Sequence, residues 1–105
     1  MSYSEFTLKV IRTLKSVPEG KVITYGDLAA LAGSPRGARQ VVRILNAMSK
    51  SHLLPWHRVI GAGGKILLQG EGAVQQEALL EAEGVEVIAG RVDMGRYAWT
   101  GVRLD

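Results

Sequence analysis

The chain has 105 residues, of which 47% are hydrophobic and 22% charged, and it contains no cysteine. This is the size of one domain, so we expect a single domain over residues 1–105, and no apolar run approaches the roughly 18 residues of a membrane span. Without cysteine, disulfides, thiolate metal sites and thiol nucleophiles are excluded. The two histidines, His52 and His57, lack the nearby carboxylate or thiolate pair of a zinc site. We therefore expect no metal and no cofactor.

Charge is distributed unevenly along the chain. Residues 1–58 hold nine Lys and Arg against three Asp and Glu, a net +6, whereas residues 59–105 hold four against seven, a net −3. A surface that binds a polyanion would therefore lie in the N-terminal half. A solvated charged face would give the same pattern, so charge alone does not establish nucleic-acid binding.

The first predicted element is an amphipathic helix over 3–17. Ser2 and Glu5 have the spacing of a capping box at its start. Pro18 and Gly20 end it, and the short β-branched segment 21–24 that follows is typical of a strand. The apolar positions that recur at helical spacing along this first helix are Phe6, Val10, Leu14 and Val17.

Two further helices follow with almost nothing between them. Thr24 can cap a helix over 25–32, and Gly33 suits the left-handed position just past its end. Ser34 as N-cap and Pro35 in the first turn then predict the start of a third helix. Two short helices joined by a three- or four-residue turn that contains glycine are the helix-turn-helix arrangement.

The third helix is predicted to have one apolar and one basic face. The buried stripe is predicted to consist of Ala38, Val41, Val42 and Leu45. The remaining surface carries Arg36, Arg39, Gln40 and Arg43. Guanidinium groups contact phosphates and read base edges, so this face favours DNA binding. The competing interpretation is a solvated helix face whose arginine stems cover apolar surface.

The segments after the third helix predict a hairpin and one more helix. A polar loop over 49–52 leads into the run 53–60, and the glycine-rich turn 61–64 would return the chain as a second strand over 65–68. A helix is predicted over 73–83. Its inward residues are predicted to be Val74, Ala78 and Leu79, and the rings of Tyr97 and Trp99 are expected to cover the edge of the core.

The position of Trp56 is not decided by periodicity, because an indole can belong to a core, a stacking surface or a pocket wall. The run Pro55-Trp56-His57-Arg58-Val59-Ile60, however, resembles the Pro-Cys-His-Arg-Val-Ile/Val signature of the O6-alkylguanine-DNA alkyltransferases, with Trp in place of the alkyl-accepting Cys. That replacement is the hallmark of the alkyltransferase-like proteins. The similarity includes residues 20–29, 38–39 and 79–84, and covers about residues 5–84 in all.

The resemblance implies a fold and a set of site residues. The fold is mostly α with a small β hairpin, a winged helix-turn-helix-like DNA-binding domain as in alkyltransferase C-terminal domains. Tyr25 would rotate the nucleotide and Arg39 would fill the vacated space, with the third helix in the minor groove. Arg36, Gln40 and Arg43 would add DNA contacts. The lesion pocket would comprise Trp56, His57, Arg58, Val59, Gln69 and Gly70.

His57 and Glu83 match the pair that activates the cysteine in the alkyltransferases, and Gln69-Gly70 replaces their Tyr-Ser lid. An indole is not a usable nucleophile at neutral pH, so binding would survive while alkyl transfer is lost. The implied partners are double-stranded DNA containing O6-alkylguanine and nucleotide excision repair proteins. We expect a monomer with no membrane attachment, intracellular and, in a bacterium, cytoplasmic and associated with the nucleoid.

Two other interpretations stay open. A helix-turn-helix transcription regulator without lesion specificity would explain the arginines but not the Pro-Trp-His-Arg run. An enzyme built on His57 and Glu83 would require a substrate that is turned over beside Trp56.

Overall fold

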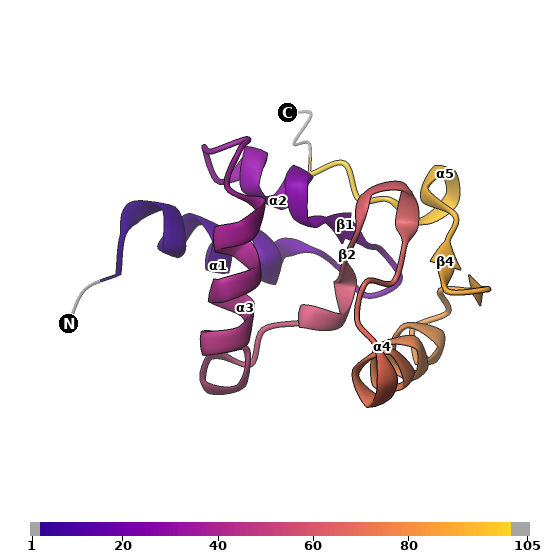
Figure 1. The fold of residues 1–105 in the computed structure, drawn as a ribbon. Coiled ribbons are helices and arrows are strands. Elements are labelled where there is room, and N and C mark those ends of the chain that lie inside the picture. The colour runs from indigo at the N-terminus through magenta and orange to yellow at the C-terminus, as the bar shows by residue number, and fades with distance from the viewer. Residues whose placement is uncertain (1–2, 102–105) are drawn as a thin grey trace.

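In the computed structural model, which describes residues 3–101, the helices α1 (Glu5–Ser16), α2 (Tyr25–Leu31) and α3 (Ala38–His52) form the N-terminal part of the molecule (Figure 1). Their apolar faces meet in one core, which the neighbouring strands complete. This first core consists of Val10, Ile11, Leu14, Val17, Ile23, Leu28, Ala29, Ala32, Val41, Ile44, Leu45, Met48, Leu54 and Val59.

The C-terminal half packs as a second layer beside the three helices (Figure 1). Its elements are η1 (Trp56–Arg58), β2 (Val59–Ile60), η2 (Ala62–Gly64), α4 (Gly70–Ala82), β3 (Val87–Ile88), β4 (Arg91–Val92) and α5 (Met94–Tyr97). They enclose a smaller core of Val22, Ile60, Leu80, Val85, Val87, Val92 and Tyr97.

A parallel strand pair joins the two cores. β1 (Ile23–Thr24) pairs with β2 so that Ile23 lies opposite Val59, a partner 36 positions further along the chain. Side chains of the two strands belong to both cores. The parallel pair therefore fixes the segment after α3 against the segment before α2.

The hairpin predicted between residues 53–60 and 65–68 is wrong. β2 takes its partner from β1, and residues 62–64 form a 3-10 turn in which Gly64 adopts a φ of +88°. A Cβ at Gly64 would overlap the carbonyl of Val92, so this turn lies directly on β4. The antiparallel hairpin of the fold is β3–β4, and Lys65 pairs instead with Arg91.

The start of α1 differs from the prediction, whereas the start of α2 is confirmed. The Ser4 hydroxyl caps α1 by accepting a hydrogen bond of 3.1 Å from the Thr7 amide, and the helix begins at Glu5. The predicted capping box involves Ser2, which lies outside the described residues. The Thr24 hydroxyl caps α2 by accepting from the Asp27 amide at 3.0 Å.

The helix α3 is shifted toward the C-terminus relative to the prediction. Residues 34–37 form a turn closed by a 2.8 Å hydrogen bond from the Gly37 amide to the Ser34 carbonyl, so the connection to α2 is longer than expected. Residues 49–52, predicted as a loop, are the last turn of α3. Val42 is 41% exposed, and the buried positions are Val41, Ile44, Leu45 and Met48.

The helix α4 buries a different face from the one predicted. Val74, Ala78 and Leu79 are exposed, and the buried side chains are Leu80 and Gln76. The buried amide of Gln76 breaks the apolar pattern on which the prediction relied. The predicted role of the tail is confirmed, since Tyr97 is buried in the second core and Trp99 packs against the first.

Candidate functional site

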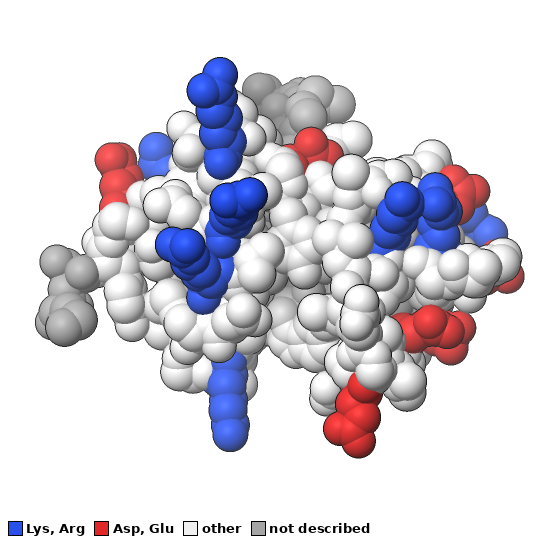
Figure 2. Space-filling view, in the orientation of Figure 1, with Lys and Arg blue, Asp and Glu red and all other residues white. Residues whose placement is uncertain are grey.

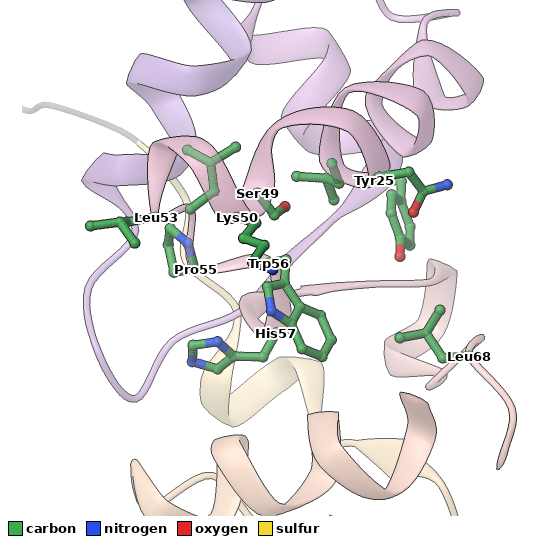
Figure 3. A pocket seen from close by; sticks show the side chains of 11 residues that line it. Tyr25, Ser49, Lys50, Leu53, Pro55, Trp56, His57 and Leu68 are labelled. Atoms are coloured by element: carbon green, nitrogen blue, oxygen red, sulfur yellow. The ribbon is translucent and has the colours of Figure 1, made fainter. Parts of the chain in front are cut away.

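A pocket of about 750 Å³ opens between the C-terminal half of α3 and the segment that follows it (Figure 3). The first residue of α2 and Leu68, which precedes α4, complete its walls. Figure 3 shows Tyr25 across the opening from Trp56. The lining residues are Tyr25, Leu45, Asn46, Ser49, Lys50, Leu53, Leu54, Pro55, Trp56, His57 and Leu68.

Trp56 forms a wall of this pocket from the first position of η1. Its amide donates a 2.8 Å hydrogen bond to the Leu54 carbonyl, which turns the chain sharply after the end of α3. The half-buried indole packs against the first core and meets the His57 ring edge to face, with centroids 6.1 Å apart. Trp56 therefore belongs both to the edge of the core and to the pocket wall. Periodicity in the sequence could not distinguish between these two positions.

Tyr25 stands at the entrance because α2 begins there, directly after its Thr24 cap. Its ring packs against the first core, and burial raises the pKa of the phenol above its ordinary value. The hydroxyl is therefore protonated at neutral pH and can donate a hydrogen bond.

Behind the pocket, the Glu83 carboxylate binds donors from three residues in two separate segments of the chain. His57 Nε2 lies 2.7 Å from Oε2, and Arg58 donates from Nη2 to Oε2 at 2.7 Å and from Nε to Oε1 at 3.0 Å. The Gly20 amide donates to Oε1 at 3.1 Å, and the Glu83 side chain is only 11% exposed. We call Glu83, His57, Arg58 and the Gly20 amide the carboxylate network.

The charge of Glu83 is stabilised by this network. Burial by itself raises the pKa of the carboxyl, but hydrogen bonds from Arg58, His57 and Gly20 outweigh it and lower the pKa to about 2. Because the carboxylate is ionised, His57 must donate from Nε2, and its Nδ1 is then the acceptor when the ring is neutral. Arg58 also donates from Nη1 to the Val17 carbonyl at 2.8 Å, which ties the end of α1 to the network.

The buried amide of Gln76 holds the other side of the same segment. Its Nε2 donates to the His57 carbonyl at 3.1 Å and to the Val59 carbonyl at 2.9 Å. Buried backbone carbonyls need such partners, so a polar residue on the inner face of α4 is required here. The segment that carries Trp56 and His57 is thus fixed from α4 as well as from α1.

The basic face of α3 lies beside the pocket. Arg39, Gln40 and Arg43 are exposed on α3, and Arg36 is exposed in the turn that precedes it. Figure 2 shows basic side chains projecting along this helix with no acidic side chain between them. Within residues 3–101 none of these arginines forms an ion pair with the protein. Their charges are therefore available to a polyanion.

The structure brings only part of the predicted pocket together. Trp56 and His57 line it, whereas Val59 is buried in the first core and the Arg58 guanidinium is held by Glu83. Gln69 and Gly70 follow Leu68 but do not line the pocket themselves. One wall of the pocket, which the sequence pattern did not predict, is formed by α3 through Leu45, Asn46, Ser49 and Lys50.

The sequence would predict that these four residues share one face of α3 if the helix were known to reach residue 52. They repeat every four positions along one side of its last turns, as neighbours on a helix do. Among the described residues the Ser49 hydroxyl is buried without a hydrogen-bond partner.

Within residues 3–101, no helix is long and apolar enough for a membrane span, and no three His, Cys, Asp or Glu side chains cluster as metal ligands would.

Known proteins with similar sequences belong to the alkyltransferase family. Residues 5–85 match the family model described as 6-O-methylguanine DNA methyltransferase, DNA binding domain. The chain is 46% identical over 95 residues to a protein of Escherichia coli (strain K12) named DNA base-flipping protein, covering 90% of this chain and 74% of the relative. It is 37% identical over 99 residues to Alkyltransferase-like protein 1 of Schizosaccharomyces pombe, covering 92% of this chain and 90% of the relative.

A solved structure shows the same fold. The crystal structure of S. pombe Atl1 in complex with damaged DNA containing O6-carboxymethylguanine superposes with a TM-score of 0.80 at 36% identity, covering 94% of this chain and 98% of that one. The mostly helical alkyltransferase-type fold expected from the sequence is therefore confirmed, although its hairpin lies elsewhere in the chain.

Proposed function

Since the chain belongs to the family of the 6-O-methylguanine DNA methyltransferase DNA-binding domain and resembles its alkyltransferase-like members, we propose a function in lesion recognition. The protein binds O6-alkylguanine in double-stranded DNA by flipping the nucleotide, and it transfers no alkyl group. One observation carries the proposal. A pocket of about 750 Å³ walled by Trp56 and His57 lies beside an exposed basic face on α3.

The absence of transfer follows from the chemistry of the side chains. In this proposal Trp56 occupies the place of the alkyl-accepting cysteine, and the chain has no cysteine elsewhere. An indole offers no lone pair of sufficient nucleophilicity to displace guanine at neutral pH. His57 and Glu83 are within hydrogen-bond distance, but they have no thiol to activate. They instead hold the pocket wall in place.

Flipping is energetically selective by itself. Extruding a base costs a few kcal/mol, and the cost is lower when alkylation has already weakened its pairing. Burial of one methyl group adds only about 0.8 kcal/mol, so easier extrusion must supply much of the preference. Tyr25 rotates the nucleotide at the pocket entrance, and Arg39 fills the gap that the base leaves. Arg36, Gln40 and Arg43 contribute contacts to the DNA backbone.

The relatives support this assignment. The E. coli relative is named for base flipping, and the S. pombe structure holds DNA with an O6-modified guanine. A protein that binds a lesion without chemistry is useful only when another system removes it, so we include hand-over to nucleotide excision repair proteins in the proposal. We further propose that the protein acts inside the cell as a monomer.

Two measurements on one pair of duplexes test the proposal. Titration against DNA containing O6-methylguanine should give tighter binding than titration against the same duplex with guanine. Incubation with duplex carrying a radiolabelled O6-methyl group should leave all label on the DNA. Equal affinity for the two duplexes would favour the transcription-regulator interpretation, and stoichiometric labelling of the protein would refute a binder without chemistry.

A further inference from the structure

The pocket has an unbalanced charge. None of the residues that line it is Asp or Glu, and Lys50 is the one Lys or Arg among them. Lys50 lies in the last turn of α3 and forms no ion pair with any of residues 3–101. Glu83, which contacts the pocket residue His57, is already bound by Arg58 and His57. The ammonium of Lys50 is therefore uncompensated by the protein.

The walls around Lys50 are otherwise largely apolar. Leu45, Leu53, Leu54, Pro55 and Leu68 line the pocket with it, and Figure 3 shows Ser49 and Lys50 on the α3 side of the opening. Lys50 is exposed, but the apolar walls beside it lower the effective dielectric constant, so a charge that enters this space is screened somewhat less than in bulk solvent. A neutral ligand gains less from that charge than an anionic one does.

We propose that Lys50 is a specificity-determining residue that favours O6 substituents ending in a carboxylate over neutral substituents of the same size. The inference rests on the proposed function, since it assigns a lesion class to the same pocket. An ammonium and a carboxylate form a charge-assisted hydrogen bond that a neutral amide cannot match. The volume of about 750 Å³ is within the range of pockets that enclose a complete small-molecule ligand, so a base with a two-carbon substituent can be held.

A charge-matched pair of lesions isolates this effect. O6-carboxymethylguanine carries the anion, and its carbamoylmethyl analogue has nearly the same shape without charge. Binding isotherms on duplexes with each lesion and with unmodified guanine give a carboxylate-to-amide affinity ratio for each variant. Using the ratio removes the general repulsion between an added anion and the DNA phosphates, because that repulsion is the same for every variant.

Lys50→Gln should lower the carboxylate-to-amide ratio about five-fold, the upper end for a partly exposed ion pair, and Lys50→Arg should preserve it. Arg43→Gln is the matched control, because Arg43 is on the same helix but does not line the pocket. It should weaken all three duplexes alike and leave the ratio unchanged.

Two other outcomes overturn the inference and are distinguishable from each other. If Lys50→Gln weakens all three duplexes by one factor, Lys50 is a phosphate contact like Arg43 and does not read the substituent. If the wild-type protein binds both modified duplexes no better than unmodified DNA, lesion binding itself fails, and the inference fails with it.

Discussion

The arginines of α3 and the arginine behind the pocket carry the same guanidinium in opposite environments. Arg39 and Arg43 are exposed on a helix with no ionic partner within residues 3–101, whereas the Arg58 side chain is 13% exposed and donates to both Glu83 and the Val17 carbonyl. Arg39 and Arg43 therefore add little to the stability of the fold, and their guanidinium groups are available to bind DNA. The guanidinium of Arg58 is hydrogen-bonded inside the protein.

Because of this difference, the buried charges should affect the free energy of unfolding, whereas the exposed charges should affect the free energy of DNA binding. A buried charge that loses its partner is strongly destabilising, because it has given up its hydration. An exposed arginine can be removed with little effect on folding, but each phosphate contact it makes adds to DNA binding. Mutations in the carboxylate network should therefore change stability, and mutations on the α3 face should change binding.

The largest expected effect is on stability, in Glu83→Gln. The change leaves the Arg58 guanidinium buried without its anion, so the free energy of unfolding should fall by about 3 kcal/mol, as measured by urea denaturation. Glu81→Gln is the matched control, because Glu81 is exposed in the last turn of α4, two residues before Glu83, and should change stability by less than about 0.5 kcal/mol. Equal, small losses in both variants would show that the network does not hold the fold.

The pH dependence of stability should show the same network. The pKa of Glu83 is lowered in the folded state from 4.5 to about 2, so its contribution is fully present above pH 4.5 and is lost as the pH falls toward 2. The stability difference between wild type and Glu83→Gln should consequently shrink between pH 5 and pH 2.5. A difference that stays constant over this range would mean that ionisation of Glu83 contributes nothing.

A smaller effect, on binding alone, should separate Arg39 from Arg43. If Arg39 stacks in the gap left by the flipped base, Arg39→Ala should cost about 1–3 kcal/mol on lesion DNA specifically. Arg43→Ala should weaken lesion and undamaged DNA equally and lower the salt slope of binding by about one. Both variants should unfold at the same urea concentration as wild type.

Salt series of binding isotherms on matched duplexes, with a fluorescent base analogue beside the lesion, measure both effects. Should the two variants lose affinity equally on both duplexes while unstacking stays intact, the flipping role assigned to Arg39 would be wrong.

The helices α1 and α2 could be predicted from the sequence, because apolar spacing and N-cap residues lie within a few positions of each other. The apolar spacing predicted that Val10 and Leu14 of α1, and Val17 at its C-cap, are buried, and the Thr24 cap predicted the start of α2. The predicted start of the third helix is too early. Ser34 and Pro35 are residues that favour a helix N-terminus, but in the structure they belong to the turn that precedes α3. That error concealed the wall of the pocket formed by Ser49 and Lys50.

The sequence by itself determined the family signature at residues 55–60, the lack of a thiol and the basic residues before and along α3, because each is a matter of residue type and short spacing. Only the tertiary structure decided the pairing of β1 with β2 and the donors that meet at Glu83, which come from positions 25, 26 and 63 residues away. It also decided that Gln76 faces inward. Local propensity carries no information about such partners, since a buried polar group is stable only where distant segments supply its hydrogen bonds.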